Sequence, residues 1–285
     1  MREVDSGWGV LGARLTVLGS GSGLECPGSR FCWRPQHTAI RLRALVPTSP
    51  AVSAVLLSGG LDSAVLLGEE ALRGAAQPIY VTAGLAWEGA ERRALAALLA
   101  AWPQGLVVRP LVTLTLDMSD LYPAGHWAIT GQAPGYHTSD EEVYLLGRNI
   151  VLLSKAAVYC AAAGIDRLVL GTLGHNPFPD ATPEFRASMS ASVSLGLGRP
   201  LSIEAPYAVE SKAEVVRRGA ALGLPVGLTL SCMNPPAAAL DATGSRGALH
   251  CGKCSKCRER HDAFIAAATP DATNYVDRTF VDGLQ

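Results

Sequence analysis

The stretch AVSAVLLSGGLDS, residues 51–63, decides the fold. Its beginning, Ala51–Leu57, is a short apolar run of the kind found in strands buried on both faces of a parallel sheet. The glycines that follow let the backbone approach phosphate oxygens, and the next helix offers free N–H groups and the positive end of its dipole. This strand, the turn and a helix over residues 63–74 therefore predict a phosphate-binding loop in an α/β fold.

Strands and helices keep alternating after this point, which favours a doubly wound, mainly parallel sheet. Pro183 directly after Thr182 suits a helix start, and Ser211 with Glu214 three residues later forms a capping box. Residues 117–147 show little periodicity, and a loop of that length inside a domain is usually functional. Further strands are predicted at residues 77–82, 105–116 and 167–170, and further helices at 88–102, 149–163, 211–222 and 258–268.

The composition is that of a globular protein. Of 285 residues, 48% are hydrophobic and 17% are charged, and the net charge of −1 gives no general attraction to nucleic acid or anionic lipid. No apolar run approaches the about 20 residues of a membrane span, and the first residues lack the apolar core of a secretion signal. Neither a membrane nor a nucleic-acid partner is expected, and the cytoplasm is the expected location.

Four cysteines form the second chemical pattern. Cys251, Cys254 and Cys257 follow one another at two-residue spacing, and Cys232 lies upstream. Three thiolates at this spacing can surround one ion, and a distant fourth completes a tetrahedral structural zinc site. An iron–sulfur cluster is the alternative, but the proline that usually follows ferredoxin ligands is absent. His250 abuts this set, which is complete without it.

The string Ser58–Ser63 (SGGLDS) differs from two common nucleotide motifs. It contains neither the Gly-Lys-Ser/Thr of the Walker loop nor the GxGxxG of the dinucleotide fingerprint. An ordinary strand-to-helix turn is the alternative, although the string is tighter than a bare pair of glycines. The predicted nucleotide-binding residues run from the end of the strand into the helix: Leu57, Ser58, Gly59, Gly60, Leu61, Asp62, Ser63, Ala64, Val65, Leu66 and Leu67.

This string resembles the pyrophosphate loop of the ATP pyrophosphatases, which include GMP synthetase, asparagine synthetase, NAD synthetase and tRNA-thiolating enzymes. The resemblance implies an adenine nucleotide α-hydrolase-like, Rossmann-like fold. It also implies ATP with Mg²⁺, which offsets the charge of the departing phosphates, and an adenylated substrate. Adenylation makes chemical sense because it turns a carboxylate or amide oxygen, a very poor leaving group, into a good one.

The phosphate loop and the cysteines together resemble the 7-cyano-7-deazaguanine synthases of the queuosine pathway. Gly147-Arg148-Asn149 is similar to that family's GRN segment, and residues 178–185 (FPDATPEF) resemble its YPDCRPEF segment. Residues 211–215 (SKAEV) resemble its TKAEIV stretch, and residues 250–258 match its zinc region. The resemblance covers about residues 52–265, which is most of the chain.

The family implies conversion of 7-carboxy-7-deazaguanine and ammonia to the nitrile through adenylated intermediates. By this resemblance Asp62 contacts phosphate and Mg²⁺, and Lys212 contacts the leaving phosphates. Asp180 and Glu184 orient the base or accept a proton from ammonium, and Arg148 pairs with a carboxylate. The alternatives are a solvated lysine, two helix-start carboxylates and a helix-capping surface arginine. Relatives are often dimers, which implies a homodimer.

Several residues depart from the family pattern. Ala181-Thr182 stand where the family has Cys-Arg, and residues 175–177 (HNP) replace acidic and aromatic residues. Residues 144–146 (YLL) replace Val-Pro, and residues 84–87 (GLAW) replace Tyr-Gly-Gln-Arg-His. The departures fall in the expected acceptor pocket, so other functions stay open: a paralogue acting on another acid or deazapurine, one that stops at the amide, a tRNA-thiolating enzyme, or a zinc-stabilised ATP sensor.

The two motifs and the compositional change near residue 50 divide the chain into four parts. Residues 1–50 hold scattered Gly, Ser, Pro and Arg without a sustained period. They indicate a disordered extension, or a natural start that lies further downstream. The other parts are an ATP-binding α/β domain (51–230), a zinc-binding segment with a docking helix (231–270) and a tail (271–285).

Overall fold

The computed structural model describes residues 52–236 and 248–283. The interpretation of residues 1–50 falls outside these ranges. In the described part, five strands form one sheet in the order β3-β2-β1-β4-β5, and all neighbouring strands run parallel. The strands are β1 (Ser53–Leu56), β2 (Ala76–Thr82), β3 (Val112–Thr115), β4 (Arg167–Val169) and β5 (Ser202–Glu204).

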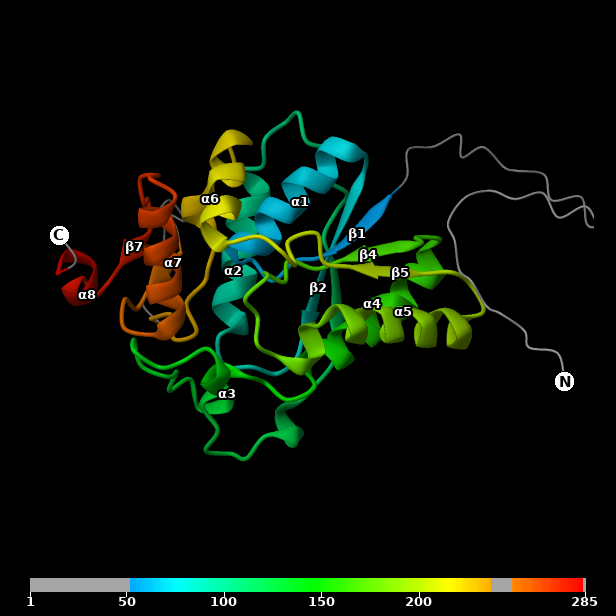
Figure 1. Cartoon of the computed structure of the whole chain (residues 1–285), viewed down its shortest axis with the longest axis horizontal. Helices are drawn as coiled ribbons and strands as arrows, with labels where there is room; N and C mark the ends of the chain where they lie inside the picture. Colours follow the sequence, from blue (N-terminus) through cyan, green and yellow to red (C-terminus); the bar gives the residue numbers. More distant parts are fainter. Residues whose placement is uncertain (1–51, 237–247, 284–285) are drawn as a thin grey trace, which may run out of the picture. The chain divides into compact units, whose positions relative to one another are not determined.

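Helices cover both faces of this sheet (Figure 1). The prediction of a doubly wound α/β fold is therefore confirmed. One face carries α1 (Leu61–Arg73), α2 (Glu88–Ala100), α6 (Lys212–Ala221) and α7 (Ser255–Ala266), and the other carries α4 (Arg148–Ala163) and α5 (Pro183–Leu197).

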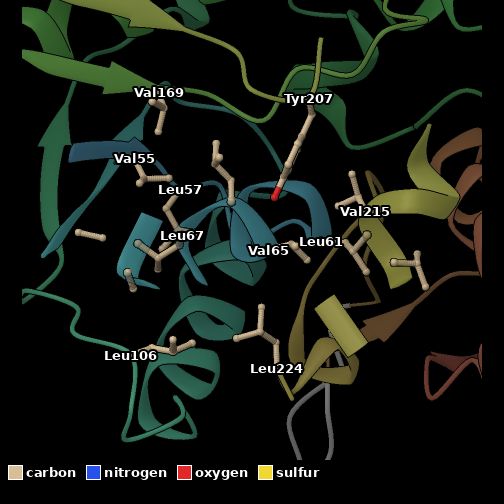
Figure 2. Close-up of a cluster of buried hydrophobic side chains, with 14 of the residues drawn as sticks. Val55, Leu57, Leu61, Val65, Leu67, Leu106, Val169, Tyr207, Val215 and Leu224 are labelled. Atoms are coloured by element: carbon tan, nitrogen blue, oxygen red, sulfur yellow. The ribbon is translucent and has the colours of Figure 1, made fainter. Parts of the chain in front are cut away.

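The position of β1 between two helix layers explains why residues 54–57 are all apolar. Successive side chains of a strand point to opposite faces of the sheet. Val55, together with Leu57 just after the strand, packs into the core under α1 and α6 (Figure 2), whereas Ala54 packs under α4. Because both faces are covered, β1 needs apolar side chains in both directions.

Local sequence signals set the start of two helices. The Thr182 side chain accepts a hydrogen bond from the Phe185 N–H (3.1 Å), and Pro183 is the first residue of α5. The Ser211 side chain accepts one from the Glu214 N–H (3.2 Å) at the start of α6. Both predicted helix starts are confirmed.

The C-terminal region adds a second, two-stranded parallel sheet of β6 (Leu249–His250) and β7 (Asn274–Tyr275). Strand β7 lies within the residues predicted as a tail, and its Tyr275 is buried. None of the helices in the described residues is long and apolar enough to span a bilayer. The remaining elements are α3 (Trp127–Thr130), α8 (Thr279–Asp282) and four short 3₁₀ turns at Ser119–Leu121, Glu141–Val143, Pro179–Ala181 and Val226–Leu228.

A buried carboxylate ties α1 to the sheet. The Glu70 side chain is fully buried and forms ion pairs with Arg167 of β4 and with Arg73. Arg167 also donates to Glu204 of β5 (2.8 Å) and to the Ser53 hydroxyl of β1 (2.8 Å). Burial raises the pKa of Glu70, but hydrogen bonds from Arg167 and Ser53 and the charge of both arginines outweigh it and leave the pKa lowered.

We expect Arg167→Met to lower the free energy of unfolding by about 3 kcal/mol, because it leaves the Glu70 charge buried with one partner instead of two. The control Arg217→Met removes an exposed ion pair to Glu214 and should cost less than about 1 kcal/mol. Both are read by chemical denaturation. Since an ionised Glu70 contributes stability above its ordinary pKa of 4.5, the Arg167 effect should shrink as the pH falls below that value. An effect equal to the control would contradict the assigned role.

Candidate active site and metal centre

The phosphate loop lies at the carboxyl end of β1, where the chain turns into α1. Gly59 adopts a left-handed conformation (φ 83°), and a Cβ atom there would lie 3.1 Å from Leu95 Cγ and 3.3 Å from the Glu91 carbonyl oxygen. Only glycine fits this close approach of the loop to α2. The turn therefore leaves the first N–H groups of α1 facing out from the helix, as a phosphate site requires.

The two serines of the loop brace it from inside. Ser58 Oγ accepts from the Gly60 N–H (3.2 Å), and Ser63 Oγ donates to the Gly60 carbonyl oxygen (3.1 Å). The Ser58 N–H donates to Ser63 Oγ (3.3 Å). Gly171, after β4, packs so closely that a Cβ atom would lie 3.2 Å from the Ser63 nitrogen. The loop is thus held in shape before any ligand binds.

Two adjoining cavities meet at this loop. The smaller, about 270 Å³, has an apolar wall at the carboxyl ends of β1 and β2 that includes Leu57 and Ile79. The larger, about 460 Å³, reaches the cysteine segment at Cys232 and Met233. Residues that line both are Ser58, Gly60, Asp62, Val143, Leu145, Arg148, Gly171, Thr172, Asn176 and Phe178. The site therefore offers two binding spaces that share the phosphate loop.

A chain of charges crosses the larger cavity. Lys212 Nζ donates to Asp62 Oδ2 (3.0 Å) and to Glu259 Oε1 (2.7 Å), and its side chain is only 13% exposed. Lys256 Nζ donates to Glu259 Oε2 (2.6 Å) and lies 3.3 Å from Asp140 Oδ1. Burial alone would lower the pKa of Lys212, but the two carboxylates outweigh it and raise the pKa. Lys212 is therefore a buried, permanently charged cation beside the phosphate loop.

The second carboxylate oxygen of Asp62 has a different environment. Asp62 Oδ1 is buried and has no hydrogen-bond partner among the described residues. A buried carboxylate oxygen without a donor is costly unless a ligand or ion completes its contacts. Asp62 therefore fits a divalent cation held against phosphates, as a hard oxygen ligand.

Arg148 and Asp180 meet at the amino end of α4. Asp180 accepts hydrogen bonds from the Asn149 N–H at Oδ2 (3.0 Å) and from Asn149 Nδ2 at Oδ1 (3.3 Å). Burial raises the pKa of Asp180 and outweighs these two bonds, which lower it. The Arg148 side chain lines both cavities, and its guanidinium makes no hydrogen bond or ion pair with a described residue. Asp180 thus fixes the start of α4. The neighbouring Arg148 places its unpaired guanidinium at the junction of the two cavities.

Some predicted site residues lie elsewhere. Glu184 is exposed in the first turn of α5 and lines neither cavity. Ala64–Leu67 are buried in α1 and also line neither cavity. Their helix runs back across the sheet, so only its first turn faces the site. The structure thus brings Leu57–Ser63, Arg148, Asp180 and Lys212 together and leaves Glu184 and the second turn of α1 outside.

A buried carboxylate that the sequence analysis missed also belongs to the site. Glu91 of α2 is 8% exposed and lines the larger cavity. Its carboxylate accepts from Tyr80 O–H (2.9 Å) and from Trp87 Nε1 (3.1 Å). Burial raises the pKa of Glu91 to about 7, although Arg148 opposes this shift. Trp87 stacks on Trp127, with ring centroids 5.4 Å apart.

The four cysteines of the second motif converge on one point. The Sγ atoms of Cys232, Cys251, Cys254 and Cys257 all lie within 4.8 Å of one another, with separations as short as 3.4 Å. Metal–sulfur bonds of about 2.3 Å in a tetrahedron place sulfur atoms about 3.8 Å apart. A four-iron cluster would spread its ligands over four metal atoms. The set therefore fits a single metal ion.

Backbone N–H groups support these sulfur atoms. The N–H groups of Asn234 and Cys251 donate to Cys232 Sγ, and that of Lys253 donates to Cys251 Sγ, each at 3.3 Å. Such bonds stabilise thiolates around a metal. His250 does not join the set: its Nε2 accepts from the Ser231 N–H (3.0 Å) and its Nδ1 bonds the Ala248 carbonyl oxygen (3.0 Å).

The segment that carries the four cysteines contacts the elements around the two cavities on two sides. The Leu230 N–H donates to the Gly59 carbonyl oxygen (2.8 Å), just before Cys232. Arg258 of α7 donates to the carbonyl oxygens of Tyr136 (2.7 Å) and Thr138 (3.2 Å) in the long loop 117–147. That loop lines the larger cavity through Trp127, Asp140, Val143 and Leu145. The cysteine segment therefore contacts both the phosphate loop and the loop that lines the larger cavity.

Sequence position alone gave few signals for the missed residues. Thr172 and Asn176 follow β4, and the rule that ligands bind beyond the carboxyl ends of parallel strands would have included them. Glu259 lies three residues after Lys256 on α7. In the sequence this spacing is typical of an ordinary exposed ion pair on a helix. Glu91 has the same ordinary appearance within α2.

We expect Gly252→Ala to disrupt the cysteine cluster. Gly252 has a φ of 78°, and a Cβ atom there would lie 1.8 Å from the Asp277 carbonyl oxygen, so the backbone must move. The loss should exceed about 2 kcal/mol of unfolding free energy and lower the bound metal per chain. Gly223→Ala, which has a similar φ but open space, should cost about 1 kcal/mol. Equal effects at both positions would mean that the contact with Asp277 is unimportant.

Comparisons with known proteins show the family to which the chain belongs. The model of the family "Queuosine biosynthesis protein QueC" matches residues 52–268. A 7-cyano-7-deazaguanine synthase of Magnetococcus marinus is 31% identical over 233 residues, which cover 78% of this chain and 95% of that protein. One of Xanthomonas campestris is 32% identical over 232 residues, which cover 78% of this chain and 96% of that protein.

Among solved structures, the U34-tRNA thiolase NcsA of Methanococcus maripaludis with its 4Fe-4S cluster aligns over 69% of this chain and 64% of its own. The TM-score of this alignment is 0.40 and the sequence identity is 15%. The family match covers far more than half of the chain, and the family expected from the motifs is confirmed. The chain belongs to the QueC family of queuosine biosynthesis proteins.

Proposed function

We propose that the chain is an ATP-dependent ligase that converts 7-carboxy-7-deazaguanine and ammonia to 7-cyano-7-deazaguanine. The relatives that carry this name match almost their whole length. The observation that carries the proposal is the junction of two cavities at the phosphate loop, where Arg148 supplies an unpaired cation. Two substrates that must react with each other need such adjoining spaces.

ATP fits the smaller cavity with its phosphates at the loop. The apolar wall of Leu57 and Ile79 suits an adenine ring, and the serine-braced loop with the N–H groups of α1 suits the phosphates. Asp62 Oδ1 would hold Mg²⁺, which offsets phosphate charge when it is bound. Lys212 stays charged beside the loop and stabilises the departing pyrophosphate.

The acid fits the larger cavity with its carboxylate at Arg148. A carboxylate oxygen attacks the α-phosphorus, and the bond to pyrophosphate breaks to give an acyl adenylate. Ammonia then bonds to the acyl carbon, and AMP leaves to give the amide. A second ATP adenylates the amide oxygen; AMP leaves with that oxygen, and the nitrogen loses its two protons to form the nitrile. Asp180 acts as a positioning residue that fixes Arg148 through the start of α4.

The metal ion of the cysteine cluster is proposed to be zinc in a structural role. Four thiolates in a closed tetrahedral set are typical of structural zinc, which leaves no open position for a substrate. In this site the ion would hold Cys232 next to Leu230, whose N–H bonds to the phosphate loop. It would also hold the start of α7, which carries Lys256 and Glu259.

We expect purified protein with ATP, Mg²⁺, ammonium and 7-carboxy-7-deazaguanine to form amide and nitrile, detected by mass spectrometry. Asp62→Asn should lower turnover by at least about 10²-fold, because it removes the charge that faces Mg²⁺ and Lys212. Asp166→Asn, an exposed carboxylate at the other end of β4, serves as the control and should keep its activity. AMP formation only with added RNA would favour a tRNA-thiolating enzyme, and tight ATP binding without turnover would favour a sensor.

We expect one zinc ion per chain by elemental analysis, and Cys254→Ser should lower this content and the stability together. Chelation should remove zinc slowly and reduce activity through loss of structure, so circular dichroism and activity should decline in parallel. Cys160→Ser, on the buried side of α4, serves as the control for metal content because this thiol is not part of the cluster. Iron in the analysis, or a brown colour, would overturn the zinc assignment.

A further inference from the structure

Glu91 lies where the two cavities meet. Its hydrogen-bond partner Tyr80 lines the smaller cavity, whereas Glu91 and its other partner Trp87 line the larger. Arg148, which lines both, acts on the charge of Glu91. If Arg148 binds the acid's carboxylate as proposed above, the acyl carbon of the adenylate forms near Glu91. This inference therefore rests on the proposed function.

Among the described acidic residues that line the larger cavity, Glu91 is the one that forms no ion pair. Asp62 and Glu259 pair with Lys212, and Asp140 pairs with Lys256. The remaining acid of that cavity is Glu210, which pairs with Arg218 at 2.6 Å. Glu91 receives hydrogen bonds only from the neutral Tyr80 and Trp87. Glu91 is therefore the carboxylate with which a cationic ligand in this cavity would pair.

The chemistry of this position suits a small cation that carries protons. Each carboxylate oxygen of Glu91 accepts one hydrogen bond, so each keeps a lone pair for a further donor. A buried carboxylate without a cation is costly, and a bound ammonium ion would offset that cost. Among the substrates, ammonium is the cation, and it must lose a proton before its nitrogen can attack.

We propose that Glu91 is a catalytic residue that binds ammonium and accepts one of its protons. The proton moves from nitrogen to the carboxylate, and the freed electron pair forms the C–N bond to the acyl carbon. The C–O bond to the AMP phosphate breaks, AMP leaves with that electron pair, and a second proton leaves the nitrogen to water. Glu91 returns its proton to solvent when the products depart.

The geometry favours Glu91 over the two acids suggested by the family motifs. Both carboxylate oxygens of Asp180 are engaged by Asn149 at the start of α4. Glu184 is exposed on α5 and lines neither cavity. Burial raises the pKa of Glu91 to about 7, opposed by Arg148, Tyr80 and Trp87 and reinforced by Glu88, so the group can take up and release a proton near neutral pH.

Two nucleophiles distinguish this role from a structural one. Hydroxylamine is already uncharged at neutral pH and traps the acyl adenylate as a hydroxamate without prior loss of a proton. In Glu91→Gln the ratio of the ammonium-dependent rate to the hydroxylamine-dependent rate at pH 7 should fall about 10²-fold. The ammonium-dependent rate of this variant should then rise with pH as more free ammonia forms. Asp166→Asn, the exposed carboxylate already used as a control and lining neither cavity, is the matched control and should keep the wild-type ratio.

A second variant tests the same role if Glu91→Gln folds poorly. Tyr80→Phe removes a hydrogen bond that lowers the pKa of Glu91. Because Glu91 must be ionised to accept a proton, the acid side of the pH profile with ammonium should shift to higher pH, and the profile with hydroxylamine should not.

Three outcomes decide between the inferences. An unchanged ratio in Glu91→Gln, or an equal fall with both nucleophiles, overturns the role of Glu91 while wild-type turnover still supports the proposed function. An unshifted profile in Tyr80→Phe also counts against Glu91. A wild-type protein that consumes no ATP with the acid and either nucleophile overturns the proposed function and this inference together.

Discussion

The ammonium group of Lys212 joins three parts of the chain that are far apart in sequence. It bonds Asp62 near the end of the phosphate loop, 150 positions earlier, and Glu259 on α7, the helix that begins within the cysteine motif. A buried cation between two carboxylates is stable only while both partners are present. The charge arrangement beside the phosphate loop therefore depends on the correct packing of α1, α6 and α7, because Lys212 bridges all three.

This dependence is the basis of the role proposed for the cysteine cluster, which supports the site without taking part in the chemistry. The cluster lies beside the segment whose Leu230 bonds Gly59, and it starts the helix that carries Lys256 and Glu259. From the same helix, Arg258 holds the loop that walls the larger cavity. A closed site for one ion can thus order both the phosphate loop, through Leu230, and the wall of the larger cavity, through Arg258.

Some of the departures from the family pattern lie together in the wall of the larger cavity. Trp87, His175, Asn176 and Pro177 all line the larger cavity, whereas the phosphate loop and the cysteines match the family. The shape and polarity of that wall decide how the acid is held, while adenylation needs only its carboxylate at Arg148. The buried Trp87 also donates to Glu91, so one departure contacts the group proposed to accept the proton. Substitution there can change the acceptor without changing the chemistry.

The sequence by itself determined the features that depend on neighbouring residues. The strand, the glycine turn and the helix that follows were predictable within a few positions, since hydrophobic pattern and helix start signals are local. The cysteine set and the capping residues Thr182 and Ser211 were predictable for the same reason. Strand boundaries were less accurate: the region 105–116 contains only the four residues of β3 in the sheet, and β5, with three, was too short to show a period.

Only the tertiary structure decided which charged residues serve the site. Lys212, at the start of a helix, has the sequence of a solvated lysine, yet it is buried because Asp62 and Glu259 meet it from distant elements. Glu91 looks like an ordinary helical acid, and its environment comes from Tyr80 on β2 and from the cavity above it. Burial and ion pairing depend on contacts between segments that are distant in sequence. A local sequence pattern therefore cannot predict which distant group will pack against a given charged residue.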